Sequence, residues 1–309
     1  MKLAFLYAGQ GAQHVGMGRD LYEIYPAFRQ VLDSAPVDFD LKKLCFDGPE
    51  DQLNDTRYTQ PCMVAFAAGV TALLREAGIT PDYAAGLSLG EYSALQCAGV
   101  FDAKTAISLV AFRGQAMADA VQGRPCGMAA VLGMDRDALK AVCAEASDAG
   151  VVECTNFNCP GQIVISGDAA AVDKAGELAK ATGAKRVLPL KVSGPFHTSL
   201  MAPAGDALRE KFQSVDFGAM EIPVLFNCLS DLKGEADTIS NLLEQQVQSS
   251  VYLEDTIRHL GELGVDTVVE IGPGRTLSGF VKKTVKGIKC YPVETAAELQ
   301  AAIAALRGE

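Results

Sequence analysis

The clearest candidate for a chemical role is a serine that stands between two glycines. Ser88 is the centre of the segment Gly86-Leu-Ser-Leu-Gly90, which fits the pattern G-x-S-x-G. A short apolar segment precedes it and a helical pattern follows it, as in the sharp strand-to-helix turn that exposes a nucleophilic serine. Glycines are needed there because the turn strains the backbone and packs it closely. The alternative is a glycine-rich turn without a chemical role.

A serine nucleophile needs a base, and the chain has three histidines. His259 lies on the polar side of a predicted helix over 254–263, which favours a solvated surface role. His14 follows a glycine-rich turn, and nothing assigns it a task. His197 ends the loop segment SGPFH, a typical place for a positioned functional residue. A histidine that caps the following helix is the alternative.

A permanent positive charge stands in an apolar stretch. Arg113 directly follows the segment ISLVAF. A buried guanidinium needs an anionic partner. It therefore indicates either an internal salt bridge or a clamp that grips a substrate carboxylate through two parallel hydrogen bonds.

Two glycine-rich loops resemble nucleotide-binding motifs but do not fit them. In Gly9-Gln-Gly-Ala-Gln13, position 14 is a histidine where G-x-G-x-x-G needs its third glycine. Residues 272–275 lack the Gly-Lys-Ser/Thr of a phosphate-binding loop. The first loop is also compatible with a tight turn whose backbone N–H stabilises an oxyanion.

Composition narrows the class of protein further. The net charge of −11 disfavours non-specific nucleic-acid binding. No apolar run reaches the about 20 residues that cross a bilayer, and residues 1–9 read as a strand and turn rather than a signal peptide. Nine irregularly spaced cysteines indicate reduced thiols in a cytoplasm. Cys154 and Cys159 have no nearby partners to complete a zinc site, so we expect no metal.

The elements around these residues predict an α/β protein. Strands are expected over 2–7, 84–87, 223–226 and 267–271. Helices are expected over 59–78 and 89–97, and a further helix should begin after an N-cap at Asp102. The last helix should begin at about residue 275. This alternation is typical of a mostly parallel sheet covered by helices.

The middle of the chain has a different order of elements. Strands are expected over 127–132, 151–157, 162–166 and 185–191, with helices capped by Asp135 and Asp168 between them. The order β-α-β-β-α-β is the ferredoxin-like motif. We therefore predict an inserted subdomain at 123–190, and a discontinuous catalytic domain over 1–122 and 191–309.

Taken together, these residues closely resemble the malonyl-CoA:acyl-carrier-protein transacylase family, over nearly the whole chain. The landmarks occur in the family order: GQGAQ at 9–13, SLGEYSAL at 88–95, Arg113 within AFRGQAM, NFNCPGQIVISG at 156–167, GPFH at 194–197, and EIGPG at 270–274. The resemblance implies a hydrolase-like α/β core with a ferredoxin-like insert.

The resemblance also implies a role for each residue that matches a family motif. Ser88 is then the acylated nucleophile, His197 its base, and Arg113 the group that holds the malonyl carboxylate. The N–H groups of Gln10 and Leu89 form the oxyanion hole, the main-chain carbonyl of Gln246 orients the histidine, and Phe196 and Met117 select the acyl group.

Two positions depart from the family pattern. Leu87 stands where the family usually has a histidine, which leaves the effect on rate and binding open. Leu253 stands where the family often has a tryptophan, which makes the placement of Gln246 less secure.

The implied activity is transfer of a malonyl group from malonyl-CoA to the phosphopantetheine thiol of acyl carrier protein, for fatty-acid synthesis. It implies no metal or redox cofactor, and no nucleic-acid or membrane partner, for a cytoplasmic monomer. Two basic patches are candidates for carrier-protein docking, Lys185 with Arg186, and Lys282, Lys283, Lys286 and Lys289. The rival interpretations are a serine hydrolase and a non-catalytic binding module.

Overall fold

The computed structural model describes residues 1–191 and 194–309, which form two compact units. The first unit contains Met1–Gly114, Asp216–Phe226 and Ile257–Glu309. The second contains Gln115–Val215 and Asn227–Thr256. Each unit is therefore assembled from segments that are far apart in the sequence.

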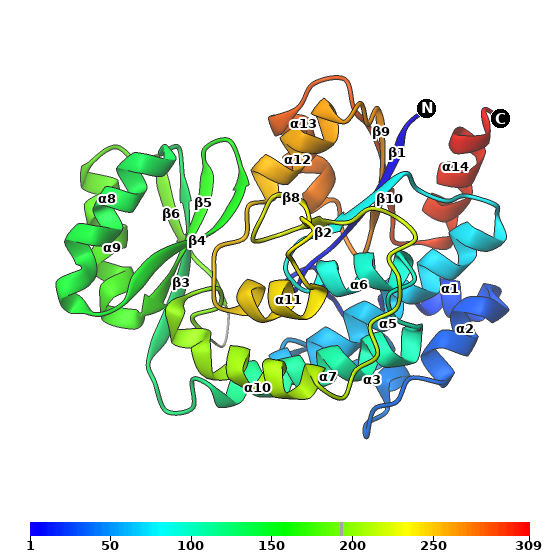
Figure 1. Ribbon diagram of the computed structural model, residues 1–309, viewed down its shortest axis with the longest axis horizontal. Coiled ribbons are helices and arrows are strands. Elements are labelled where there is room, and N and C mark those ends of the chain that lie inside the picture. Colours follow the sequence, from blue (N-terminus) through cyan, green and yellow to red (C-terminus); the bar gives the residue numbers. More distant parts are fainter. Residues whose placement is uncertain (192–193) are drawn as a thin grey trace. The chain divides into compact units, whose positions relative to one another are not determined.

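A four-stranded parallel sheet forms the centre of the first unit (Figure 1). Its strand order is β10-β9-β1-β2, and β1 aligns Tyr7 with Gly86 of β2 and with Ile271 of β9. All five residues of β1 are buried and apolar or aromatic, as expected for a strand covered on both faces. The strands are β1 (Leu3–Tyr7), β2 (Tyr83–Gly86), β9 (Thr267–Ile271) and β10 (Lys289–Val293).

Helices surround this sheet. The helix α6 packs against β1 and β2, and α13 and α14 pack against β10 (Figure 1). The helices of this unit are α1 (Arg19–Ile24), α2 (Pro26–Asp33), α3 (Leu41–Asp47), α4 (Glu50–Leu53), α5 (Thr56–Glu76), α6 (Gly90–Cys97), α13 (Thr276–Thr284) and α14 (Ala296–Arg307), and the short strand β7 (Leu225–Phe226) also belongs to it.

The start of α5 corrects the sequence prediction. The helix was expected over 59–78, which would place Pro61 in its first turn, but it begins at Thr56. The Asp55 carboxylate accepts a hydrogen bond from the N–H of Arg57 at 3.0 Å and caps the helix one turn earlier. Pro61 consequently lies inside the helix.

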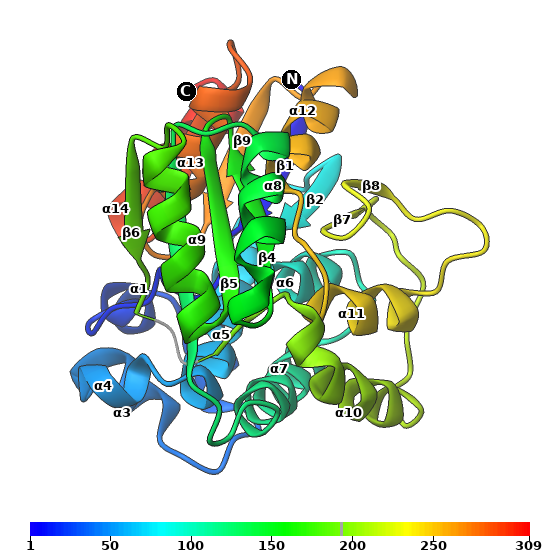
Figure 2. The same ribbon diagram turned by 90° about the vertical axis from the view of Figure 1, so that its left-hand side faces the viewer.

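The second unit contains a separate antiparallel sheet with the order β4-β5-β3-β6. Two helices, α8 and α9, cover one face of it (Figure 2). Their apolar faces and the strands enclose a core that includes Leu139, Phe157 and Ile165. The elements are β3 (Cys126–Leu132), α8 (Arg136–Ala146), η1 (Ser147–Ala149), β4 (Val152–Cys159), β5 (Gln162–Asp168), α9 (Ala169–Ala181), β6 (Arg186–Pro189), η2 (Ser199–Met201), α10 (Ala202–Phe212), β8 (Asp231–Leu232) and α11 (Ile239–Val247). Two further helices, α7 (Ala103–Asp119) and α12 (Leu253–Glu262), have residues in both units.

The mixed α/β class and the order of elements in the middle of the chain are as predicted. Asp102 and Asp135 cap α7 and α8 through hydrogen bonds from the N–H groups of Thr105 and Ala138. Asp168 does not cap α9 with its side chain, which was the prediction. Its carboxylate instead pairs with Arg124 and accepts the N–H of Val151, so it is already occupied.

Membrane insertion through a helix finds no support in the part of the chain that the structure describes. None of the helices there combines the length and the apolar character that a bilayer span requires.

Candidate active site

The turn that carries Ser88 requires both of its glycines. Ser88 lies between β2 and α6 with φ 52°, a left-handed conformation that a residue with a side chain rarely adopts. A Cβ at Gly86 would lie 2.0 Å from the backbone carbon of Gly90, and one at Gly90 would lie 2.2 Å from the carbonyl oxygen of Tyr7. The turn therefore closes only with glycine at these two positions, and it leaves Ser88 half-buried at the carboxyl end of the sheet.

The loop after β1 lies beside this turn. Because β1 and β2 are parallel neighbours, both loops leave the sheet at the same edge. A Cβ at Gly9 would lie 2.5 Å from the carbonyl oxygen of Leu87, so the two loops touch. Gln10 follows Gly9, and its side-chain amide donates a hydrogen bond of 2.8 Å to the hydroxyl of Thr56.

Leu89 occupies the N-cap position of α6, immediately after Ser88. The first N–H groups of a helix have no acceptor within the helix, and the helix dipole is positive at this end. The N–H of Leu89 is therefore a suitable donor for a negative charge that develops next to Ser88. The backbones of residues 10 and 89 lie in adjacent loops of one unit.

Arg113 belongs to the same unit as Ser88 and reaches it. Its guanidinium is 1% exposed and donates to the Ser88 hydroxyl at 3.3 Å and to the amide oxygen of Gln60 at 2.9 Å. The guanidinium carbon also lies 5.5 Å from the centre of the Tyr92 ring, within the range of a cation–π contact. The arginine is thus oriented from two sides next to the candidate nucleophile.

Burial perturbs the titration of this group. Desolvation lowers the pKa of Arg113, and the nearby Tyr92 and Glu91 counteract part of that effect. Burial likewise raises the pKa of the Tyr92 hydroxyl. Arginine still stays protonated at neutral pH, so the site contains a buried positive charge.

In the second unit, His197 is held by a main-chain carbonyl. Its Nδ1 lies 2.8 Å from the carbonyl oxygen of Gln246, and both residues are buried. A carbonyl oxygen only accepts, so Nδ1 carries the proton and Nε2 of the neutral ring is left as an acceptor, as a base requires. This is the contact that the family resemblance implied.

The alternative role considered for His197, capping the next helix, is wrong. Thr198 caps the helical turn η2, because its hydroxyl accepts the N–H of Leu200 at 3.3 Å. The same hydroxyl donates to the carbonyl of Pro195 at 2.6 Å. His197 itself has φ 63°, a left-handed conformation that the neighbouring contacts must maintain.

The remaining candidates are placed as follows. Phe196 and Met117 belong to the second unit and are 7% and 1% exposed. A Cβ at Gly194 would lie 2.8 Å from the Phe196 ring, so this glycine makes room for the ring. Leu87 is half-buried on the Ser88 turn, and Leu253 is buried in α12.

The other two histidines have separate surroundings. His14 forms an ion pair with Glu294, whose other oxygen accepts the N–H of Gly274 at 2.8 Å. Burial lowers the pKa of His14, but its contacts with the Val15 carbonyl and Glu294 outweigh this and raise it overall. His259 lies half-buried in the last turn of α12.

Sequence reasoning missed two residues that orient the site. Thr56 accepts from Gln10 and Gln60 accepts from Arg113, and both are fully buried at the start of α5. They are four residues apart, so they lie on one face of the helix. The available signal was weak, because the first turn of this helix also contains Arg57 and Thr59, which are polar as well.

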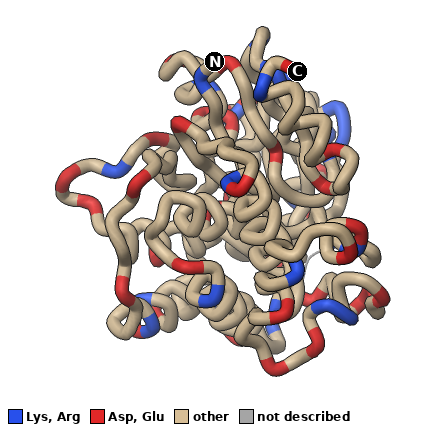
Figure 3. The backbone as a smooth tube through the Cα atoms, turned by 90° about the vertical axis from the view of Figure 1, so that its right-hand side faces the viewer, with Lys and Arg blue, Asp and Glu red and all other residues tan. Residues whose placement is uncertain are grey.

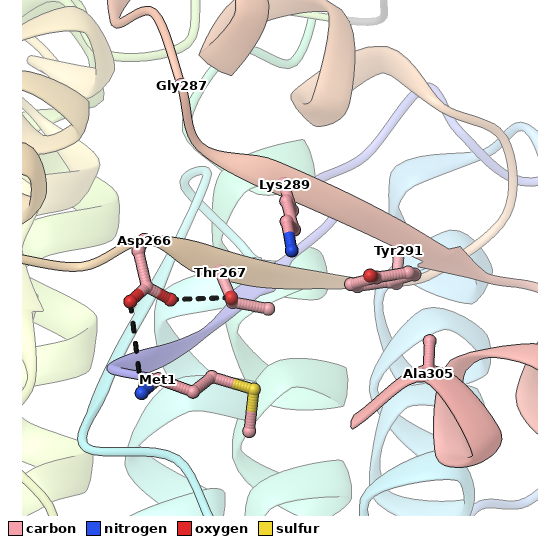
Figure 4. A pocket seen from close by; sticks show the side chains of 7 residues that line it. All are labelled: Met1, Asp266, Thr267, Gly287, Lys289, Tyr291 and Ala305. Carbon is pink, nitrogen blue, oxygen red and sulfur yellow. Dashed lines mark hydrogen bonds and ion pairs between the residues drawn. The ribbon is translucent and has the colours of Figure 1, made fainter. Parts of the chain in front are cut away.

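A pocket of about 350 Å³ lies at the amino ends of β9 and β10, at the edge opposite the Ser88 turn. Figure 4 shows the Asp266 carboxylate bound to the Thr267 hydroxyl and to the amino group of Met1, with Lys289 nearby. No serine, cysteine or histidine is among the residues that line it, which are Met1, Asp266, Thr267, Gly287, Lys289, Tyr291 and Ala305.

Comparison with known proteins gives a consistent result over the full length. Residues 4–303 match the acyl transferase domain family. The chain is 44% identical to the malonyl CoA-acyl carrier protein transacylase of Bacillus subtilis, covering 100% of this chain and 98% of that protein. It is 37% identical to the Escherichia coli K12 protein of the same name, covering 98% and 99%.

Solved structures show the same similarity. The malonyl CoA-acyl carrier protein transacylase of Clostridium perfringens matches with a TM-score of 0.95 and 38% identity, covering 100% of this chain and 98% of that one. A malonyl-transacylase solved in complex with its type II PKS acyl-carrier protein matches with a TM-score of 0.95 and 39% identity, covering 100% of both chains.

Proposed function

Because the chain belongs to the malonyl CoA-acyl carrier protein transacylase family, we propose that it transfers malonyl groups from malonyl-CoA to acyl carrier protein for fatty-acid synthesis. It is an acyltransferase that works through a malonyl-serine intermediate. The observation that carries the proposal is the Ser88 turn, with its hydroxyl in contact with the buried Arg113.

In the first half-reaction, the Ser88 oxygen attacks the thioester carbonyl carbon while Nε2 of His197 takes the hydroxyl proton. The N–H groups of Gln10 and Leu89 stabilise the oxyanion of the tetrahedral intermediate, and such a donor contributes about 10²- to 10³-fold in rate. The carbon–sulfur bond then breaks. The imidazolium of His197 returns its proton to the departing coenzyme A thiolate, and malonyl-Ser88 remains.

In the second half-reaction, His197 takes the proton of the phosphopantetheine thiol, and the thiolate attacks malonyl-Ser88. Collapse of this intermediate restores the serine hydroxyl with the proton from His197. The Gln246 carbonyl stabilises the imidazolium in both halves, since it accepts the Nδ1 proton. This arrangement does not need the carboxylate of a hydrolase triad.

Arg113 selects the acyl group. Its guanidinium grips the malonyl carboxylate, whereas an acetyl group has no carboxylate to form this buried ion pair, a difference of several kcal/mol. Phe196 and Met117 are buried apolar side chains, and their bulk disfavours a branched acyl group. No metal or redox cofactor takes part in the proposed chemistry, which is proton transfer and acyl transfer alone.

Carrier proteins are acidic, and this chain is acidic as well, so docking needs a local basic surface. Acidic and basic residues are spread along the backbone (Figure 3). Lys185 and Arg186 are exposed beside Leu188 and Leu190, which are 45% and 38% exposed. A basic edge next to an apolar surface has the composition of a protein interface, so this patch is the stronger candidate.

The second candidate patch contains Lys282, Lys283 and Lys286, all exposed. Its fourth member, Lys289, lines the same pocket as Asp266 (Figure 4). The negative charge of Asp266 offsets the positive charge of Lys289 there. Glutamate at Lys185 and Arg186, or at Lys282 and Lys283, weakens carrier-protein binding, measured by titration calorimetry, when that patch is the docking surface. A patch whose reversal leaves the affinity unchanged is not the docking surface.

Finer features of the protein belong to the same proposal. The element order and the strand order β4-β5-β3-β6 support a ferredoxin-like subdomain at 123–190 inserted into a hydrolase-like core over 1–122 and 191–309. The chain works as a cytoplasmic monomer, and neither nucleic acid nor membrane takes part.

Mass spectrometry of the acylated protein tests the function. After incubation with malonyl-CoA, the Ser88 peptide should contain a malonyl adduct that disappears when the carrier protein is added. Ser88→Ala should prevent the adduct. Release of free malonate without transfer would favour a serine hydrolase, and no adduct at all would favour a binding module.

A further inference from the structure

The loop that contains His197 is bound by a carboxylate from the antiparallel sheet. Both carboxylate oxygens of Glu153, on β4, accept the backbone N–H of Ser199, at 3.2 and 3.3 Å. The Ser199 hydroxyl forms a further short hydrogen bond to Oε1 of the same group. Hydrogen bonds from both the backbone and the side chain therefore join the residue two positions after His197 to one side chain of β4.

The other side of the His197 contact is bound to the same strand. Gln246 lies near the end of α11, and the chain that follows it runs along β4. The Ser250 hydroxyl donates to the Cys154 carbonyl at 2.8 Å, and the N–H of Val251 donates to the Thr155 carbonyl at 2.7 Å.

A further hydrogen bond closes this connection along the strand. The N–H of Phe157 donates to the Val251 carbonyl at 2.9 Å, and its ring stacks on Tyr252 with 5.1 Å between ring centres. Residues 153–157 of β4 thus bind the segments that carry both partners of the 2.8 Å hydrogen bond between His197 and Gln246.

The backbone of His197 explains why such support is needed. A residue with a side chain rarely adopts φ 63°, and such a conformation persists only when its surroundings hold it. Thr198 and Pro195 restrain the loop from within. Glu153 restrains it from a separate element, which has its own hydrophobic core.

We propose that Glu153 is a positioning residue for His197, and that it maintains the hydrogen bond from Nδ1 to Gln246 by holding Ser199. The inference rests on the proposed role of His197 as the base. Since Glu153 acts only through the orientation of the imidazole, its loss should lower the rate of acyl transfer while malonyl-CoA binding stays unchanged.

The kinetic test compares Glu153→Ala and Ser199→Ala with Glu145→Ala, which removes an exposed carboxylate of α8. We expect kcat to fall about tenfold in Glu153→Ala, because the substitution removes a charge-assisted hydrogen bond. KM for malonyl-CoA should stay within about twofold of the wild-type value. Ser199→Ala should have a smaller effect, because its N–H remains. In the double variant the two effects should not add, since both remove the same interaction.

An NMR measurement tests the inference without activity. The chain has only three histidines, so ¹⁵N-histidine labelling gives a simple ring spectrum, assigned with His14→Gln and His259→Gln. In the wild type, the Nδ1 proton of His197 should exchange slowly with water. In Glu153→Ala and Ser199→Ala it should exchange faster, and in Glu145→Ala it should not change.

The outcomes separate the two proposals. An unchanged Nδ1 proton signal and unchanged kcat in both Glu153→Ala and Ser199→Ala would overturn the positioning role. A raised KM with unchanged kcat would also overturn it. A wild-type protein that binds malonyl-CoA without forming an adduct would instead overturn the proposed function, whatever the NMR spectrum shows.

Discussion

Replacing Arg113 by alanine gives the sharpest test of how the site selects malonyl groups. The guanidinium is 1% exposed, so its pairing with a substrate carboxylate takes place out of water. Removing one partner of a buried charged pair costs about 3–5 kcal/mol. At about 1.4 kcal/mol for each factor of ten, kcat/KM for malonyl-CoA should fall by about 10²- to 10⁴-fold.

Acetyl transfer should respond much less to the same change. An acetyl group has no carboxylate, so the substitution removes no ion pair with this substrate. For acetyl transfer, Arg113→Ala removes only the hydrogen bond from Arg113 to Ser88 near the reacting atoms, and at 3.3 Å this bond is long. A typical hydrogen bond contributes a net of about 0.5–1.5 kcal/mol. The rate of acetyl transfer should therefore change by at most about tenfold. The preference for malonyl over acetyl should therefore collapse.

The assay measures kcat/KM for malonyl-CoA and acetyl-CoA with the same carrier protein. Arg113→Lys keeps the charge without the planar fork and should give an intermediate preference. Arg75→Ala is the matched control, because it removes a guanidinium of α5 that binds the Cys97 carbonyl. Equal losses for both substrates in Arg113→Ala, at an unchanged melting temperature, would refute the carboxylate clamp.

Three further predictions follow from neighbouring contacts. The amide oxygen of Gln60 lies 2.9 Å from the Arg113 guanidinium, so Gln60→Glu places a carboxylate there that should compete with the malonyl carboxylate. Steady-state kinetics should show KM for malonyl-CoA raised by about 10- to 100-fold. An unchanged KM would contradict this. Gly90→Ala places a Cβ against the backbone of β1, so it should lower the free energy of unfolding, measured by urea titration, by about 1–3 kcal/mol. Gly279→Ala in α13 is the control, because its Cβ would lie in open space and should not destabilise the protein. The pKa of His14 is raised in the folded protein, so the stability that its ion pair contributes is present below about pH 6.5 and is lost as the pH rises through the folded pKa. Urea titrations between about pH 6 and 8 should show this loss in the wild type and not in His14→Gln.

The sequence by itself determined the features that depend on a few consecutive residues. The Ser88 turn was predictable because a strand, a G-x-S-x-G segment and a helix lie next to each other in the chain, and the geometry at Gly86 and Gly90 agrees. The caps at Asp102 and Asp135 were predictable for the same reason. Asp168 follows the same local rule, but Arg124, 44 residues away, binds its carboxylate instead.

Only the tertiary structure decided which distant groups hold the reactive side chains. Gln60 is 53 residues from Arg113, and Glu153 is 46 residues from Ser199. The contact of His197 with Gln246, 49 residues away, was implied by the family resemblance and by no local pattern. Propensity and hydrophobic periodicity act over one or two turns of helix or one strand, and they carry no information about which segments pack together. That choice follows from the burial of whole faces and from strand pairing, so the partners of Arg113 and Ser199 emerge only once the chain has folded.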